Sequence, residues 1–173
     1  MCDGKVIADV RADLEKSTAD QATVGHSLFL AFFKSKPERQ DMFPKYKGRP
    51  ISDLEKDETL KAHGGAVMEF LANFINSVDD SEVIKIMSQE FADLHRRFYI
   101  PHSAIAGTKG QVILTFSKYG MDSQSWPAFL DYFFKTIEYE LTERLVHPND
   151  RPFYSNVLSS FAPLLYCVIG AIQ

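Results

Sequence analysis

The stretch Ala62-His63-Gly64-Gly65, taken with the pair Leu94-His95, decides the fold of this chain of 173 residues. Each histidine lies in a segment with helical periodicity, in which one face is apolar and the other is charged. If the two helices face each other, an imidazole stands on each side of the space between them. A planar metal macrocycle needs that arrangement, because one side chain binds the metal and a second polar group faces the open coordination position.

Helical periodicity extends through most of the chain, whereas the alternating pattern of strands is scarce and we find no internal repeat. The last strong helix is expected to begin at Asp122-Ser123, with Pro127 in its first two turns, where proline is tolerated. Glycines weaken the segment 102–119 as a helix, and Gly120 is expected to end it. The sequence therefore predicts an all-α fold, with helices over about residues 5–16, 19–35, 57–76, 79–97 and 122–141.

Helix boundaries and one corner can be placed from local signals. Pro37 ends the second predicted helix, and Asp79 with Glu82 has the spacing of a capping box at the start of the fourth. Residues 42–50 contain two prolines and a glycine, so they form a corner. The same corner carries Phe43 and Tyr46, whose rings favour burial. We therefore expect this corner to fold back onto the core.

The composition is ordinary for a soluble domain, with 45% apolar and 24% charged residues. A net charge of −4 and the lack of a Lys/Arg block argue against a nucleic-acid partner. Fourteen Phe and seven Tyr indicate an aromatic core or an aromatic-lined pocket. Cys2 and Cys167 lie at opposite ends, which excludes a zinc ribbon or a disulfide framework. Without an apolar signal core at the N-terminus, we expect a cytoplasmic protein.

From about Val6 to Arg144 the chain resembles the globin family, in particular single-domain intracellular haemoglobins and myoglobins of invertebrates. The start of the last helix, Asp122-Ser123-Gln124-Ser125-Trp126, is similar to that of some of those proteins, and Gly25 falls where globins need a small residue for a close helix crossing. The resemblance rests on residues that occur together, in order and at globin-like separations, namely Pro37, Phe43, His63, Val67 and His95.

The resemblance implies a globin fold, a three-on-three helical sandwich, over residues 1–145 and a C-terminal helical extension over 146–173. It implies haem b as the cofactor and His95 as its proximal ligand, with the second imidazole nitrogen bonded to a backbone carbonyl one turn earlier. His63 is expected on the distal side, either as a hydrogen-bond donor to dioxygen or as a sixth iron ligand. The alternatives are a structural His95 and a surface His63.

Further residues are assigned to the cofactor by the same resemblance. Phe29, Phe43 and Val67 would wall the distal side. On the other side, Phe91, Tyr99 and Ile100 would contact the proximal face, and Lys45 would lie near a haem propionate. The remaining histidines, His26, His102 and His147, are interpreted as structural or solvated.

The function implied is reversible binding of dioxygen or another diatomic gas, for transport, storage or scavenging. Three alternatives stay open. His63 could serve acid–base chemistry in a peroxidase or in nitric-oxide chemistry, although no catalytic residue is assigned. A six-coordinate iron could act as a redox or gas sensor through a partner. A haem-free member of the fold is disfavoured by Phe43 and His95 together.

The last stretch of the chain, residues 153–173, contains no charged residue. Its apolar residues recur at steps of three and four, which predicts a helix with a kink at Pro163. About 20 such residues are enough to span a bilayer. We favour instead a helix that docks on the domain or on a second copy as a homodimer, and expect no membrane association.

Overall fold

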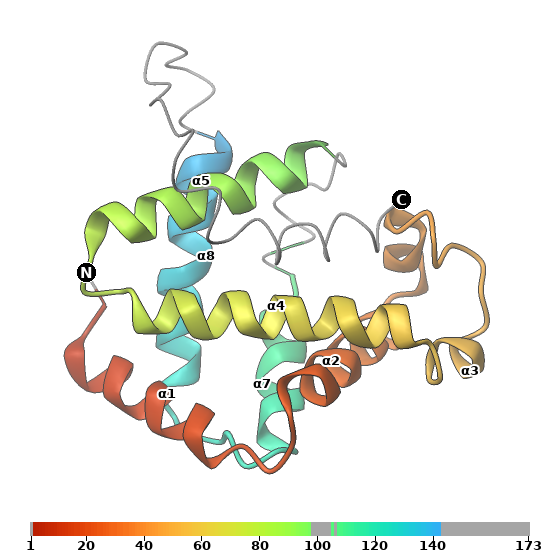
Figure 1. Ribbon diagram of the computed structural model, residues 1–173, viewed down its shortest axis with the longest axis horizontal. Helices are drawn as coiled ribbons and strands as arrows, with labels where there is room; N and C mark the ends of the chain where they lie inside the picture. The colour runs from red at the N-terminus through yellow and green to blue at the C-terminus, as the bar shows by residue number, and fades with distance from the viewer. Residues whose placement is uncertain (1, 98–104, 106, 143–173) are drawn as a thin grey trace.

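The computed structural model describes residues 2–97, 105 and 107–142, and within these the regular elements are all helical (Figure 1). The all-α prediction is therefore confirmed. The helices are α1 (Gly4–Lys16), α2 (Gln21–Ser35), the 3-10 helix η1 (Pro37–Met42), α3 (Ile51–Leu54), α4 (Glu58–Asn76), α5 (Ser81–Arg97), α7 (Lys109–Ser117) and α8 (Trp126–Thr142).

Aspartate side chains begin the first helices, because a carboxylate accepts hydrogen bonds from the free N–H groups of a first turn. Asp3 caps α1, Asp20 caps α2 and Asp57 caps α4. At α5 the cap is Asp80, whose carboxylate accepts from the backbone of residues 82 and 83 at 3.1 Å each. The capping box predicted from Asp79 is therefore wrong, since α5 begins one residue later than that pattern requires.

Two other predicted boundaries differ from the structure. The last helix begins at Trp126 and not at Asp122-Ser123, because those residues form the connection that contacts α1. Pro127 does lie in the first turn of α8, as expected. In the weak segment 102–119 the regular helix α7 spans only Lys109–Ser117, and Gly120 follows it with a left-handed φ of 81°. The short helix α3 was not predicted.

Figure 1 shows α4 running across the molecule between α5 on one side and α1 and α2 on the other, with α7 and α8 crossing behind it. A close crossing joins α2 and α4 at Gly25 and Gly64. A Cβ atom on either glycine would overlap the backbone of the other, so only glycine allows this approach. The small residue predicted at Gly25 is confirmed, and the crossing brings His63 close to α2.

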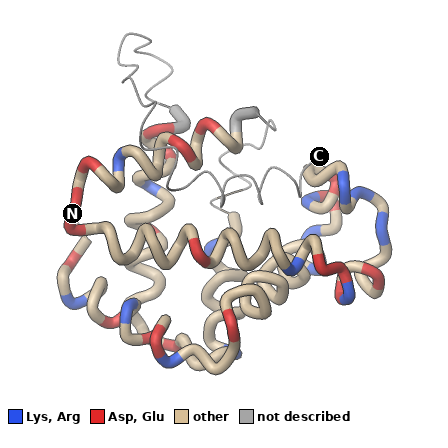
Figure 2. The backbone as a smooth tube through the Cα atoms, in the orientation of Figure 1, with Lys and Arg blue, Asp and Glu red and all other residues tan. Residues whose placement is uncertain are grey.

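The core consists of two clusters of buried apolar side chains. The larger joins α1, α2, α4, α5, α7 and α8 and includes the fully buried Trp126. The smaller gathers around the corner after η1, where Phe43 and Tyr46 are buried as predicted. In Figure 2 acidic and basic residues are spread over most of the tube, while most of α4 carries neither, which is typical of a helix packed on several sides.

None of the described helices combines the length and apolarity that crossing a bilayer requires. The predicted helix over 153–173, with its kink at Pro163, lies outside the described residues. The same holds for the predicted boundary between residues 145 and 146, and the expected docking of that helix therefore stays a prediction.

Candidate functional site

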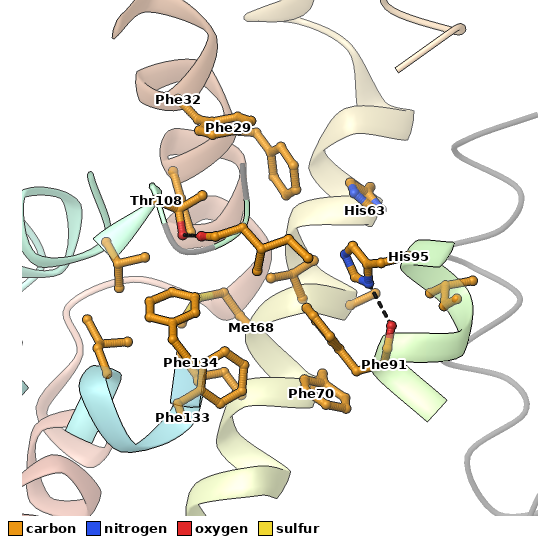
Figure 3. A pocket seen from close by; sticks show the side chains of 18 of the residues that line it. Phe29, Phe32, His63, Met68, Phe70, Phe91, His95, Thr108, Phe133 and Phe134 are labelled. Carbon is orange, nitrogen blue, oxygen red and sulfur yellow. Dashed lines mark hydrogen bonds between the residues drawn. The ribbon is translucent and has the colours of Figure 1, made fainter. Parts of the chain in front are cut away.

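A cavity of about 180 Å³ opens between α4 and α5 and is also bordered by α2, α7 and α8 (Figure 3). A water molecule needs roughly 10–15 Å³ of such space, so the cavity has room for something much larger. Six of the residues predicted to contact a cofactor line it: Phe29, Phe43, His63, Val67, Phe91 and His95.

His95 enters the cavity from α5 with one of its two nitrogens already engaged. Its Nδ1–H donates a hydrogen bond of 2.8 Å to the carbonyl oxygen of Phe91, one turn earlier, as the sequence predicted. Burial lowers the pKa of His95, and the bond to Phe91 only partly opposes this effect. The imidazole is therefore neutral, and its Nε2 keeps a lone pair that can bind a metal.

His63 enters from α4 and is 3% exposed, which rules out the alternative of a surface histidine. Its Nδ1 is buried and has no hydrogen-bond partner among the described residues. Burial, followed by the proximity of His95, lowers the pKa of His63 to about 4. An unpaired buried polar atom costs about 1–3 kcal/mol, so the chain keeps this imidazole beside the cavity at a cost in stability.

Aromatic rings hold the His63 side chain from two directions. The ring of Phe29 lies 4.6 Å from the imidazole, centroid to centroid, at an interplanar angle of 48°. The Phe43 ring lies at 6.1 Å and 67°. Since no described hydrogen bond orients Nδ1 of His63, these two rings determine how the imidazole faces the cavity.

The other predicted residues do not all reach the cavity. Lys45 is half-buried but is not among the lining residues. Tyr99 and Ile100 lie outside the described residues, as do His102 and His147. His26 has the structural role expected of it, since its Nε2–H donates a 2.8 Å bond to the carbonyl oxygen of Leu54.

Two polar lining residues were missed from the sequence. Glu90 on α5 borders the cavity, where burial, and after it the carboxylate of Asp93, raise its pKa. Thr108 also lines the cavity, and its hydroxyl donates to the carbonyl oxygen of Ile105 at 2.7 Å. Neither residue gives a signal in the sequence, because Glu90 fits a solvated helix face and Thr108 lies between two glycines.

The residues present fit a planar iron macrocycle. Two neutral imidazoles, from His63 and His95, enter one largely apolar cavity, and one nitrogen of His63 lacks a partner. Within the described residues, no three His, Cys, Asp or Glu side chains gather as a metal-binding group. A metal here would need further ligand atoms that a macrocycle itself carries.

Comparison with protein families matches residues 26–160 to the model described as Globin. Among similar proteins, Globin-1 of Liolophura japonica is 29% identical over 43% of this chain and 57% of its own length. The myoglobin of Auxis rochei is 32% identical over 45% of this chain and 54% of its own. The chain thus spans about half the length of these relatives.

Solved structures share the fold at low sequence identity. A Drosophila melanogaster haemoglobin, described as hexa-coordinate, superposes with a TM-score of 0.71 at 15% identity, over 79% of this chain and 93% of that one. Ferric myoglobin of Aplysia limacina superposes with a TM-score of 0.70 at 13% identity, over 81% and 99%. The predicted globin fold is therefore confirmed.

Proposed function

Because the chain belongs to the globin family, we propose that it holds a haem between His95 and His63 and reversibly binds dioxygen or another diatomic gas. The observation that carries the proposal is the pair of imidazoles, from His63 and His95, that line one largely apolar cavity. We propose haem b as the form of the cofactor, and storage, transport or scavenging of the gas as the role.

His95 is proposed as the proximal ligand. Its Nδ1–H is fixed by the Phe91 carbonyl, so the tautomer that leaves Nε2 free for iron is the stable one. That hydrogen bond also orients the imidazole before any ligand arrives. When bound, the haem supplies the iron to which a diatomic gas can coordinate.

His63 is proposed to face the gas. A hydrogen bond to an acceptor that carries charge stabilises by about 1.5–3 kcal/mol, which corresponds to one or two decades in affinity. The apolar side chains around it, Phe29 and Val67 among them, exclude water and anions from the same space. Their packing therefore favours a small, uncharged ligand over a charged one.

A six-coordinate resting state is the second candidate, in which His63 itself occupies the sixth position. The observation that favours it is the lack of any described partner for His63 Nδ1, since no hydrogen bond has to break before the imidazole moves. The similarity of fold to a haemoglobin described as hexa-coordinate is in keeping with this candidate.

The absorption spectrum of the full chain tests the proposal. The absorption spectrum of the ferrous protein should change on exposure to air and return on degassing. The spectrum before exposure separates five-coordinate from six-coordinate iron. His95→Ala should lose hemin, whereas His26→Ala, which removes an imidazole outside the cavity, should retain it. A colourless chain that refuses added hemin, or full hemin retention by His95→Ala, would contradict the proposal.

We also propose a cytoplasmic protein that forms a homodimer through residues 146–173. The apolar periodicity of residues 153–173 supports this, because one apolar stripe needs a surface to cover it. Sedimentation of the full chain and of a chain ending at residue 145 tests it. The full chain should sediment as a dimer and the shortened chain as a monomer. The same number of subunits per particle in both chains would contradict the proposal.

A further inference from the structure

Phe91 contacts His95 in two independent ways. Its carbonyl oxygen accepts the hydrogen bond from Nδ1 of His95, and its ring stacks on the imidazole with centroids 3.9 Å apart and an interplanar angle of 26° (Figure 3). Among the ring pairs of the described residues this is the shortest centroid distance. One residue therefore holds both an edge and a face of the imidazole.

The ring of Phe91 is itself fixed by two other helices. Phe70 from α4 lies 5.2 Å from it at 31°, and Phe133 from α8 lies 6.0 Å from it at 77°. A ring held on several sides has few rotamers open to it. The orientation of Phe91 is thus set by the packing of α4 and α8 against α5, and not by α5 alone.

These contacts remove different motions of His95. A hydrogen bond at Nδ1 fixes where that atom lies but still allows the ring to tilt about the bond. A stacked neighbour fixes the plane of the ring, since tilting would separate the two faces. Together they direct Nε2 into the cavity with little freedom left to lose when a ligand binds.

We infer that Phe91 is a positioning residue that sets the ring plane of His95 and thereby slows the loss of the cofactor. The inference rests on the proposed function, because it takes His95 as the iron ligand. It goes beyond that function by assigning retention to the aromatic side chain of a residue that does not itself bind the metal.

The matched test compares Phe91→Leu with Phe134→Leu in the full chain. Both phenylalanines are half-buried and line the same cavity, but the ring contact found for Phe134 is with Phe133, 5.2 Å away, and not with His95. Phe91→Tyr serves as the conservative variant, because it keeps the stacked ring. The measurements are the NMR shifts of the His95 ring protons before hemin is added, and the rate of hemin loss afterwards.

The His95 protons should be displaced upfield by the ring current of Phe91 in the wild type, in Phe134→Leu and in Phe91→Tyr, and the displacement should vanish in Phe91→Leu. Hemin loss should be about two- to tenfold faster in Phe91→Leu than in Phe134→Leu, the scale expected for one aromatic pair, and near the wild-type rate in Phe91→Tyr.

Equal hemin loss from the two leucine variants would overturn the inference, as would a missing upfield displacement in the wild type. Either result would leave the proposed function intact as long as the wild type binds hemin and His95→Ala does not. Failure of the wild type to bind hemin would instead remove the proposed function, so the two failures are distinguishable.

Discussion

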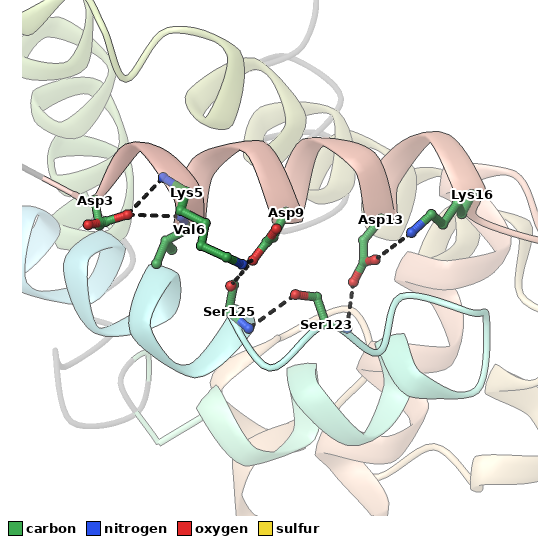
Figure 4. A network of polar contacts seen from close by, with 8 residues as sticks. All are labelled: Asp3, Lys5, Val6, Asp9, Asp13, Lys16, Ser123 and Ser125. Atoms are coloured by element: carbon green, nitrogen blue, oxygen red, sulfur yellow. Dashed lines mark hydrogen bonds and ion pairs between the residues drawn. The ribbon is translucent and has the colours of Figure 1, made fainter.

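The carboxylate of Asp13 in α1 accepts a hydrogen bond of 2.8 Å from the indole N–H of Trp126 at the start of α8. The same oxygen accepts from the backbone N–H of Ser123, also at 2.8 Å (Figure 4). Asp13 is 3% exposed, so this carboxylate is a buried link between the first and last described helices.

Replacing Asp13 by alanine should therefore leave the indole N–H and a backbone N–H without acceptors. A buried donor without a partner costs about 1–3 kcal/mol, so urea unfolding should show a loss within or above that range. Trp126 is the only tryptophan of the chain, and its fluorescence in the hemin-free protein reports the local change.

Asp131→Ala is the control for the Asp13 prediction. Asp131 also forms an ion pair, with Lys109, but its side chain is 70% exposed. Exposed pairs contribute about 0–1 kcal/mol, so this variant should unfold close to the wild type with unchanged fluorescence. An equal loss from both variants would show that burial of the Asp13 link contributes nothing.

The lowered pKa of Asp57, the N-cap of α4, predicts how the stability of the chain depends on pH. Burial acts to raise the pKa of Asp57, but hydrogen bonds from Thr59, Leu60 and Arg49 outweigh it and hold the pKa well below the usual range. A carboxyl with a lowered folded pKa stabilises fully above its unfolded value of about 3.9, and that contribution is lost as the pH falls toward the folded value.

Asp57→Ala should thus lower the free energy of unfolding by about 0.5–2 kcal/mol at neutral pH, the range for an N-cap. The difference from the wild type should shrink steadily below about pH 4, as measured by urea midpoints across a pH series. Asp53→Ala, an exposed carboxylate in the preceding short helix, is the control and should differ little at any pH. A constant gap down to low pH would refute the role of charge at Asp57.

Periodicity was enough to predict the main helices, because each carries an apolar face that any packed fold must bury. It failed where a distant contact decides a boundary. Asp79 and Asp80 are adjacent and chemically identical as caps. Asp79, however, forms an ion pair with Arg11 of α1 at 3.1 Å, and Asp80 caps the helix. Ser125 likewise bonds to Asp9 at 2.6 Å in the connection before α8. Neither contact is visible in the local sequence.

The candidate site, like the helix boundaries, could be predicted only in part. Placing His63 and His95 at one cavity could be predicted, since both lie on helices whose order and spacing matched a known family. Glu90 and Thr108 could not, because a charged or hydroxyl side chain borders a cavity only when the helices cross at a particular place. The stack of Phe91 on His95 was also beyond prediction, since it depends on side-chain rotamers fixed by α4 and α8.

The glycine crossing gives a further prediction. Gly64→Ala would drive a Cβ atom into the backbone of Gly25, and backbone cannot yield as a flexible side chain does. Overpacking typically costs about 1–3 kcal/mol, so we expect a loss at the upper end of that range or above, together with weaker hemin retention as α4 shifts. Gly110→Ala, in open space within α7, should instead stabilise by about 0.4–1 kcal/mol. Both effects are measured by urea unfolding, and a tolerated Gly64→Ala would refute the close crossing.

His63 offers the test that separates function from stability. Its buried Nδ1 has no described partner and therefore destabilises the hemin-free chain. His63→Leu should raise the free energy of unfolding by about 1 kcal/mol or more, and it should weaken gas binding by about tenfold. Thr115→Val is the matched control, because Thr115 is 1% exposed, also carries a buried oxygen without a described partner, and does not line the cavity. This control should stabilise the chain and leave gas affinity unchanged. Equal gas affinity in His63→Leu and wild type would mean that His63 makes no contribution to gas binding.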